Sequence, residues 1–137
     1  MSRKIIFGII FSVWLIILIL LSLWPTVNSI IRQNISEFRW DYLEHFLCYF
    51  ILGLFYILWR INQNLYIPAS EFILFLLAGL FFSWLTEYIQ VNIPGRAFNI
   101  YDMISNMVGI IIGTLMSYFI IVRILLRNYL RRNSSCL

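Results

Sequence analysis

Long apolar stretches alternate with short polar segments along this chain. Four of the stretches are long enough to cross the roughly 30 Å hydrocarbon core of a bilayer, which takes about 20 helical residues. They cover residues 5–23, 42–59, 72–91 and 103–122. A helix satisfies its backbone hydrogen bonds internally, as lipid requires. The pattern therefore predicts an all-α polytopic membrane protein, an antiparallel bundle of four transmembrane helices in a single domain over residues 1–137.

Polar residues predict where several of these helices begin and end. Asp41 is well placed as the N-cap or first-turn acid of the second helix, and Glu71 as the first-turn acid of the third. Asn92-Ile93-Pro94-Gly95 has the composition of a tight turn and is expected to follow the third helix. Residues 123–137 form a basic tail after the fourth stretch.

The positions of the basic residues predict which side of the membrane each segment occupies. If both ends of the sequence are cytoplasmic, seven Lys and Arg residues lie inside and three, Arg32, Arg39 and Arg96, lie outside. This asymmetry agrees with the positive-inside rule. We therefore expect a multi-pass membrane protein with both termini in the cytoplasm.

Composition supports the membrane assignment and narrows the set of partners. The chain is 62% hydrophobic and only 12% charged, well outside the usual range for a soluble domain. The net charge of +4 comes largely from residues that flank apolar stretches, so we expect contacts with membrane lipids and none with nucleic acid. Cys48 and Cys136 fall in different layers of the predicted bundle and indicate no disulfide.

Polar side chains recur at helical spacing on three of the predicted helices. One face of the second helix carries Asp41, His45 and Tyr49, because these residues are four apart. Comparable faces are expected on the third and fourth helices, and Arg96 lies in the loop between them. The candidate ligand-binding residues are Asp41, His45, Tyr49, Glu87, Gln90, Arg96, Asp102 and Asn106.

Under the proposed topology these groups share one depth on the outer side of the membrane. A carboxylate inside hydrocarbon costs about 2.5 to 3.5 kcal/mol, so Glu87 should face the bundle and find a partner, for which His45 and Arg96 are the candidates. Gly109 and Gly113 are spaced to let the fourth helix approach a neighbour closely. Simpler interpretations remain open at this stage: Asp41 and Asp102 as helix caps, Arg96 as a lipid anchor and His45 as an interfacial residue.

Several of these short motifs together resemble the VanZ-like family of small bacterial membrane proteins. The motifs are Asp41-x-x-x-His45-x-x-x-Tyr49, Glu87-x-x-Gln90, Pro94-Gly95-Arg96 and Asp102-x-x-x-Asn106-x-x-Gly109-x-x-x-Gly113. The resemblance implies a bacterial cell-envelope protein located in the inner membrane, and the family takes its name from a protein associated with teicoplanin resistance. Members often have lysine directly after the first aspartate, where this chain has Tyr42.

Three functions are compatible with these patterns. The first is binding or modulation of an anionic envelope component, a lipid-linked phosphate or a peptidoglycan precursor, by Arg96 with neutral hydrogen-bonding neighbours. The second is a membrane-embedded enzyme, for which His45, Glu87 and Asp102 are the candidate catalytic residues. The third is a small structural subunit with a membrane-protein partner. We expect no cofactor and, because metal-ligand spacing of the HExxH type is absent from the sequence, no metal.

Overall fold

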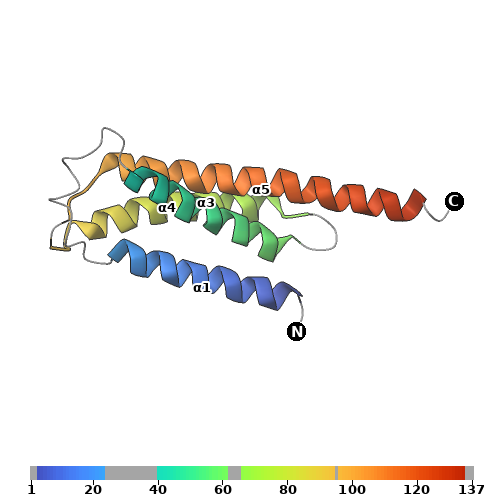
Figure 1. The fold of residues 1–137 in the computed structure, drawn as a ribbon, viewed down its shortest axis with the longest axis horizontal. Helices are drawn as coiled ribbons and strands as arrows, with labels where there is room; N and C mark the ends of the chain where they lie inside the picture. The colour runs from blue at the N-terminus through green and yellow to red at the C-terminus, as the bar shows by residue number, and fades with distance from the viewer. Residues whose placement is uncertain (1–2, 24–39, 62–65, 95, 135–137) are drawn as a thin grey trace.

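The computed structural model describes residues 3–23, 40–61, 66–94 and 96–134, and every regular element in them is an α-helix. The helices are α1 (Arg3–Leu23), α3 (Trp40–Arg60), α4 (Ala69–Gln90) and α5 (Ile100–Ser134). All four are long and apolar enough to span a membrane. Figure 1 shows them side by side, with successive helices running in opposite directions. The prediction of an all-α bundle with four membrane-spanning helices is confirmed.

Two helix boundaries sharpen the sequence prediction. Helix α3 begins at Trp40, which places Asp41 in its first turn. Helix α5 begins at Ile100 and continues to Ser134, although the apolar stretch covers only residues 103–122. The predicted tail is therefore helical as far as Ser134. Hydrophobicity marks the part of a helix that lies in lipid, whereas its first residue depends on capping, which apolar length does not report.

Helix α5 packs against α3 more extensively than any other pair of described helices. A Cβ atom added to Gly109 would collide with the carbonyl oxygen of Phe46, and one added to Gly113 with that of Phe50. The predicted close approach through these glycines is confirmed, and the neighbour is α3. Gly109 meets Phe46 and Gly113 meets Phe50, so residue numbers rise in the same direction along both helices. Helices α3 and α5 therefore run parallel.

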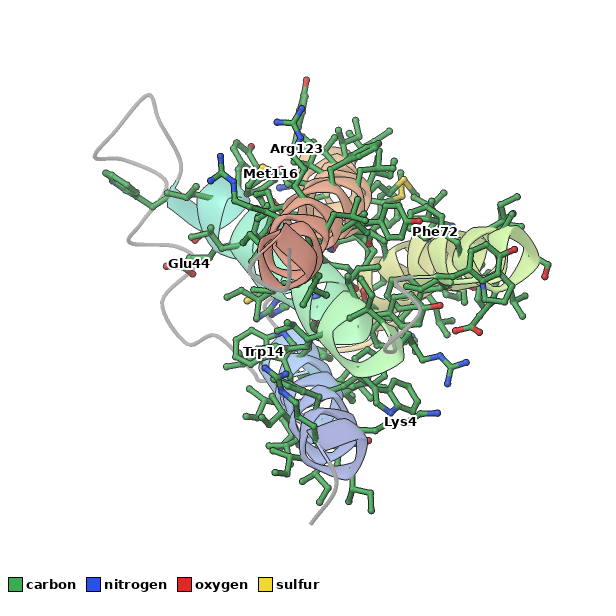
Figure 2. The ribbon with its side chains drawn as sticks, turned by 90° about the vertical axis from the view of Figure 1, so that its right-hand side faces the viewer. Lys4, Trp14, Glu44, Phe72, Met116 and Arg123 are labelled. Carbon is green, nitrogen blue, oxygen red and sulfur yellow. The ribbon has the colours of Figure 1, made fainter. Side chains whose placement is uncertain are left out.

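Helix α1 lies on the other side of α3 from α5, as the view onto the end of the bundle shows (Figure 2). The indole Nε1–H of Trp14 donates a 3.0 Å hydrogen bond to the carbonyl oxygen of Cys48. Leu18 is the buried residue of α1 and packs with Tyr49, Leu52 and Ile110 in the core. The remaining surface of α1 is largely apolar and exposed, as expected of a helix that contacts lipid.

A polar contact fastens α3 to α4 at the end of the bundle where both chain termini lie (Figure 1). The Arg60 guanidinium makes two hydrogen bonds to the Glu71 carboxylate, of which the one from NH2 to Oε2 measures 2.6 Å. The Tyr56 hydroxyl donates to the same carboxylate over 3.1 Å. Residues 91–94 and 96–99, which lie between α4 and α5 and include Arg96, are at the opposite end (Figure 1).

Candidate functional site

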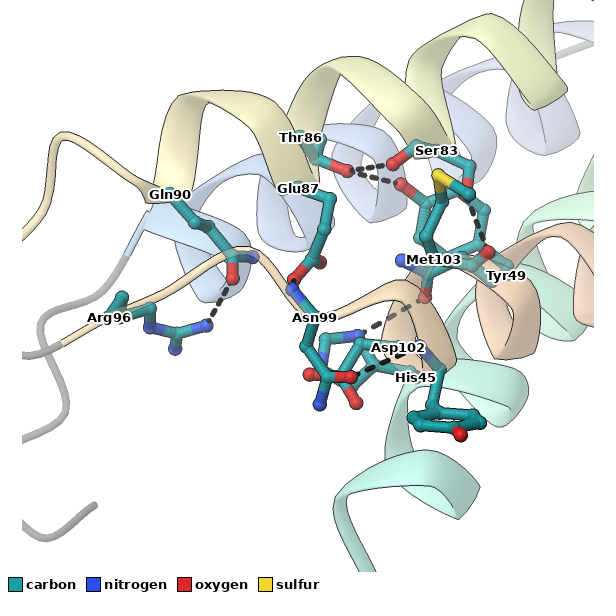
Figure 3. A network of polar contacts seen from close by, with 12 residues as sticks. His45, Tyr49, Ser83, Thr86, Glu87, Gln90, Arg96, Asn99, Asp102 and Met103 are labelled. Atoms are coloured by element: carbon teal, nitrogen blue, oxygen red, sulfur yellow. Dashed lines mark hydrogen bonds and ion pairs between the residues drawn. The ribbon is translucent and has the colours of Figure 1, made fainter. Parts of the chain in front are cut away.

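Polar side chains from α3, α4, α5 and the loop before α5 converge at the end of the bundle away from the termini (Figure 3). We call this group the polar cluster. It consists of His45 and Tyr49 from α3, Ser83, Thr86, Glu87 and Gln90 from α4, Arg96 and Asn99 from the loop, and Asp102 from α5. Asn106 of α5 belongs to it through its contact with His45.

Glu87 is the most deeply buried charged group of the cluster, with 0% exposure. Its Oε1 accepts a 3.0 Å hydrogen bond from the backbone N–H of Asn99. Its Oε2 is buried and has no hydrogen-bond partner among the described residues. His45 and Arg96, the predicted partners, attract the carboxylate electrostatically without bonding to it, whereas Asp102 repels it. The hydrogen bond itself comes from a backbone group, which the pattern of side chains could not reveal.

Asn99 explains how the start of α5 is tied to the end of α4. Its side-chain Oδ1 accepts a 3.0 Å hydrogen bond from the backbone N–H of Tyr101, so Asn99 caps α5 while its own N–H binds Glu87. Sequence reasoning missed this residue, because it placed the helix start near residue 103. The preference of asparagine for N-cap positions is the signal that could have identified it.

His45 joins α3 to α5 through both ring nitrogens. Its Nδ1 lies 3.2 Å from Oδ1 of Asn106, and since an amide oxygen only accepts, Nδ1 carries the proton and donates. Its Nε2 lies 3.7 Å from Oδ2 of Asp102, which becomes an ion pair when the imidazole is protonated. Asp102 and Asn106 are 8% and 1% exposed. Asp102 lies in the first turn of α5 and does not occupy its N-cap, since Asn99 does.

Arg96 is held over the end of α4 by the last residue of that helix. Its NH1 group donates a 2.9 Å hydrogen bond to Oε1 of Gln90, and Gln90 is only 2% exposed. The backbone N–H of Arg96 donates to the carbonyl of Ile93 over 3.1 Å, in the segment that follows α4. We expected Glu87 to position Arg96. In the structure Arg96 donates its hydrogen bond to Gln90 instead, and Glu87 attracts the guanidinium electrostatically.

Hydroxyl groups connect the deeper part of the cluster. The Tyr49 hydroxyl lies 2.9 Å from the hydroxyl of Thr86, and the Thr86 hydroxyl donates to the carbonyl of Ser83 over 3.0 Å. The Ser83 hydroxyl in turn donates to the carbonyl of Met103 over 3.1 Å. Thr86 is a further residue that sequence reasoning missed; its place three residues after Ser83, on the same face of α4, is the available signal.

The structure thus gathers the predicted residues from His45 to Asn106 at one end of the bundle. Asp41 is half-buried in the first turn of α3, one helical turn before His45. Within the described part of the chain, no three His, Cys, Asp or Glu side chains are grouped closely enough to hold a metal ion. The arrangement that the structure does show is a buried hydrogen-bonded network with an arginine at its edge.

Comparison with known proteins identifies a family. Neither the curated proteins nor the solved structures contain a match to the chain. The family model described as VanZ/LLP1 matches residues 5–123, a range that contains α3, α4, most of α1, the larger part of α5 and every residue of the polar cluster. This multi-pass membrane protein therefore belongs to the VanZ/LLP1 family.

Proposed function

We propose that the protein binds or modulates an anionic component of the cell envelope at the polar cluster. The observation that carries the proposal is the placement of Arg96, whose guanidinium is oriented by Gln90 beside a buried network at one end of the bundle. A guanidinium held in this way presents planar donors that match the oxygens of a phosphate or a carboxylate. A lipid-linked phosphate and a peptidoglycan precursor both carry such groups.

The predicted binding residues have two different roles in this proposal. Arg96 and Gln90 lie at the loop end of the cluster, where a ligand would arrive. Tyr49 and Asn106 are bonded to Thr86 and His45 and are almost fully buried. They hold the helices that carry the site in place, and a ligand does not need to touch them.

The side of the membrane is part of the same proposal. The seven-to-three distribution of basic residues supports cytoplasmic termini in the bacterial inner membrane, and the cluster lies at the end opposite the termini. It would then face the outer leaflet, where envelope precursors are used. On this basis the proposal also states that the protein changes the susceptibility of the cell to glycopeptides such as teicoplanin.

The test compares Arg96→Ala with Asn92→Ala, an exposed position in the same loop. Each protein is purified in native nanodiscs, and the phospholipids and polyprenyl phosphates that accompany it are quantified by mass spectrometry. Loss of charge-assisted hydrogen bonds should lower the amount of the bound phosphate lipid roughly tenfold in Arg96→Ala. The Asn92→Ala protein should retain it.

Glycopeptide susceptibility is measured in the same strains. A strain producing Arg96→Ala should behave like one that lacks the protein, whereas Asn92→Ala should behave like wild type. Unchanged lipid content together with unchanged susceptibility in Arg96→Ala would refute the proposed function.

A further inference from the structure

The charged groups of the polar cluster are buried to different extents. Glu87 and Asp102 are 0% and 8% exposed, whereas Arg96 is half-buried in the loop at the end of the helices. Two carboxylates and one guanidinium leave an excess negative charge when His45 is neutral. A ligand that was only an anion would add its own negative charge to an interior that is already acidic.

One atom in this interior indicates what a complementary ligand must supply. The backbone N–H of Asn99 binds Oε1 of Glu87 and so fixes the orientation of the carboxylate. The other oxygen, Oε2, is buried with no hydrogen-bond partner among the described residues. A buried carboxylate oxygen without a donor is unfavourable, because it has lost its bonds to water and gained none in return.

Protonation of Glu87 would not resolve this deficit. It would remove the negative charge, but a proton on Oε2 would create an O–H group that needs an acceptor of its own. A hydrogen-bond donor that approaches Oε2 satisfies the atom and offsets the acidic interior at the same time.

We propose that the ligand carries a hydrogen-bond donor, a hydroxyl or an ammonium group, next to its anionic group. The anionic group binds Arg96, and the donor reaches inward to Oε2 of Glu87. The ligand class is therefore a phosphodiester or similar anion with a polyol or amino substituent. This inference rests on the proposed function and specifies the ligand of that site.

Matched pairs of lipids test the inference directly. Phosphatidylglycerol and phosphatidylpropanol are both anionic, but only the first has headgroup hydroxyls. Phosphatidylethanolamine and phosphatidylcholine are both zwitterionic, but only the first has N–H donors. Detergent-solubilised protein is mixed with each pair in equal amounts, and the lipid retained is counted by native mass spectrometry.

Wild-type protein should retain the donor-bearing member of at least one pair roughly tenfold more than its match, as expected for a hydrogen bond to a charged acceptor. The pair that shows the preference identifies the donor as hydroxyl or ammonium. Glu87→Gln should abolish the preference, because the carboxamide has one acceptor oxygen, and that oxygen is needed by Asn99. Arg96→Ala should weaken retention of both members of the pair.

The outcomes separate this inference from the proposed function. If Arg96→Ala retains all four lipids as wild type does and leaves glycopeptide susceptibility unchanged, the proposed function fails. If Arg96→Ala weakens retention but wild type holds both members of each pair equally, only the inference about Glu87 is overturned. The wild-type comparison decides the matter even where Glu87→Gln does not fold.

Discussion

A single proton accounts for the direction of the hydrogen bond between Tyr49 and Thr86. The Thr86 hydroxyl gives its proton to the carbonyl of Ser83, so the 2.9 Å contact with Tyr49 must use the Tyr49 proton. Tyr49 is 1% exposed and Thr86 is 5% exposed, so both groups are buried inside the bundle. This bond joins α3 to α4 directly beneath the ionisable part of the cluster.

Replacement of Tyr49 by Phe should therefore leave the Thr86 oxygen without its donor. We expect a loss of about 0.5–1.5 kcal/mol of unfolding free energy, the usual net value of such a bond, measured by thermal or denaturant unfolding in mild detergent. Tyr101→Phe is the control, since Tyr101 is exposed in the first turn of α5. An equal loss of unfolding free energy in both variants would show that the Tyr49–Thr86 hydrogen bond does not stabilise the contact between α3 and α4.

Glycine decides how closely α3 and α5 approach. The backbone of α3 occupies the space that a side chain at Gly109 or Gly113 would need. The carbonyl that meets Gly109 belongs to Phe46, the residue directly after His45. The close approach therefore also sets the 3.2 Å distance between Nδ1 of His45 and Oδ1 of Asn106. The small size of Gly109 and Gly113 therefore allows both the packing of α3 against α5 and the contact between His45 and Asn106.

Gly109→Ala should push the two helices apart, because a backbone carbonyl cannot rotate away as a side chain can. We expect about 1–3 kcal/mol of destabilisation, as for other overpacked positions, together with loss of lipid retention at the cluster. Gly8→Ala is the matched control: its Cβ would meet the side chain of Trp59 at 2.8 Å, and that side chain can move. Stability is measured by thermal unfolding in detergent, and a larger loss in Gly8→Ala than in Gly109→Ala would contradict this account.

At the scale of the whole molecule, the two ends of the bundle differ in chemistry. The end with both termini has basic residues and the Arg60–Glu71 contact, whereas the opposite end has the buried polar cluster. Helix α5 has 35 residues, and at about 1.5 Å per residue it exceeds the roughly 30 Å of hydrocarbon by a wide margin. Its final turns, which include Arg127, should therefore extend beyond the hydrocarbon at the terminal end.

This arrangement predicts opposite labelling of the two ends in intact cells. In a background with Cys48→Ser and Cys136→Ser, Asn92→Cys should react with a membrane-impermeant maleimide from outside. Arg127→Cys should react only after the cells are permeabilised. The opposite pattern would invert the topology and place the polar cluster on the cytoplasmic side.

The sequence by itself determined the number and type of the spans, because a hydrophobic stretch must match the thickness of lipid wherever it lies. It also indicated the end at which His45, Glu87, Arg96 and Asp102 gather, since helical spacing and loop position set their depth. Only the tertiary structure decided the partners. Glu87 is bonded by the backbone of Asn99, and Arg96 is held by Gln90, because hydrogen bonds depend on the rotation of each helix and the path of the loop. The unsatisfied Oε2 of Glu87 arises from the same cause: once Asn99 fixes the carboxylate, the packing of α3, α4 and α5 decides whether a donor can reach its second oxygen.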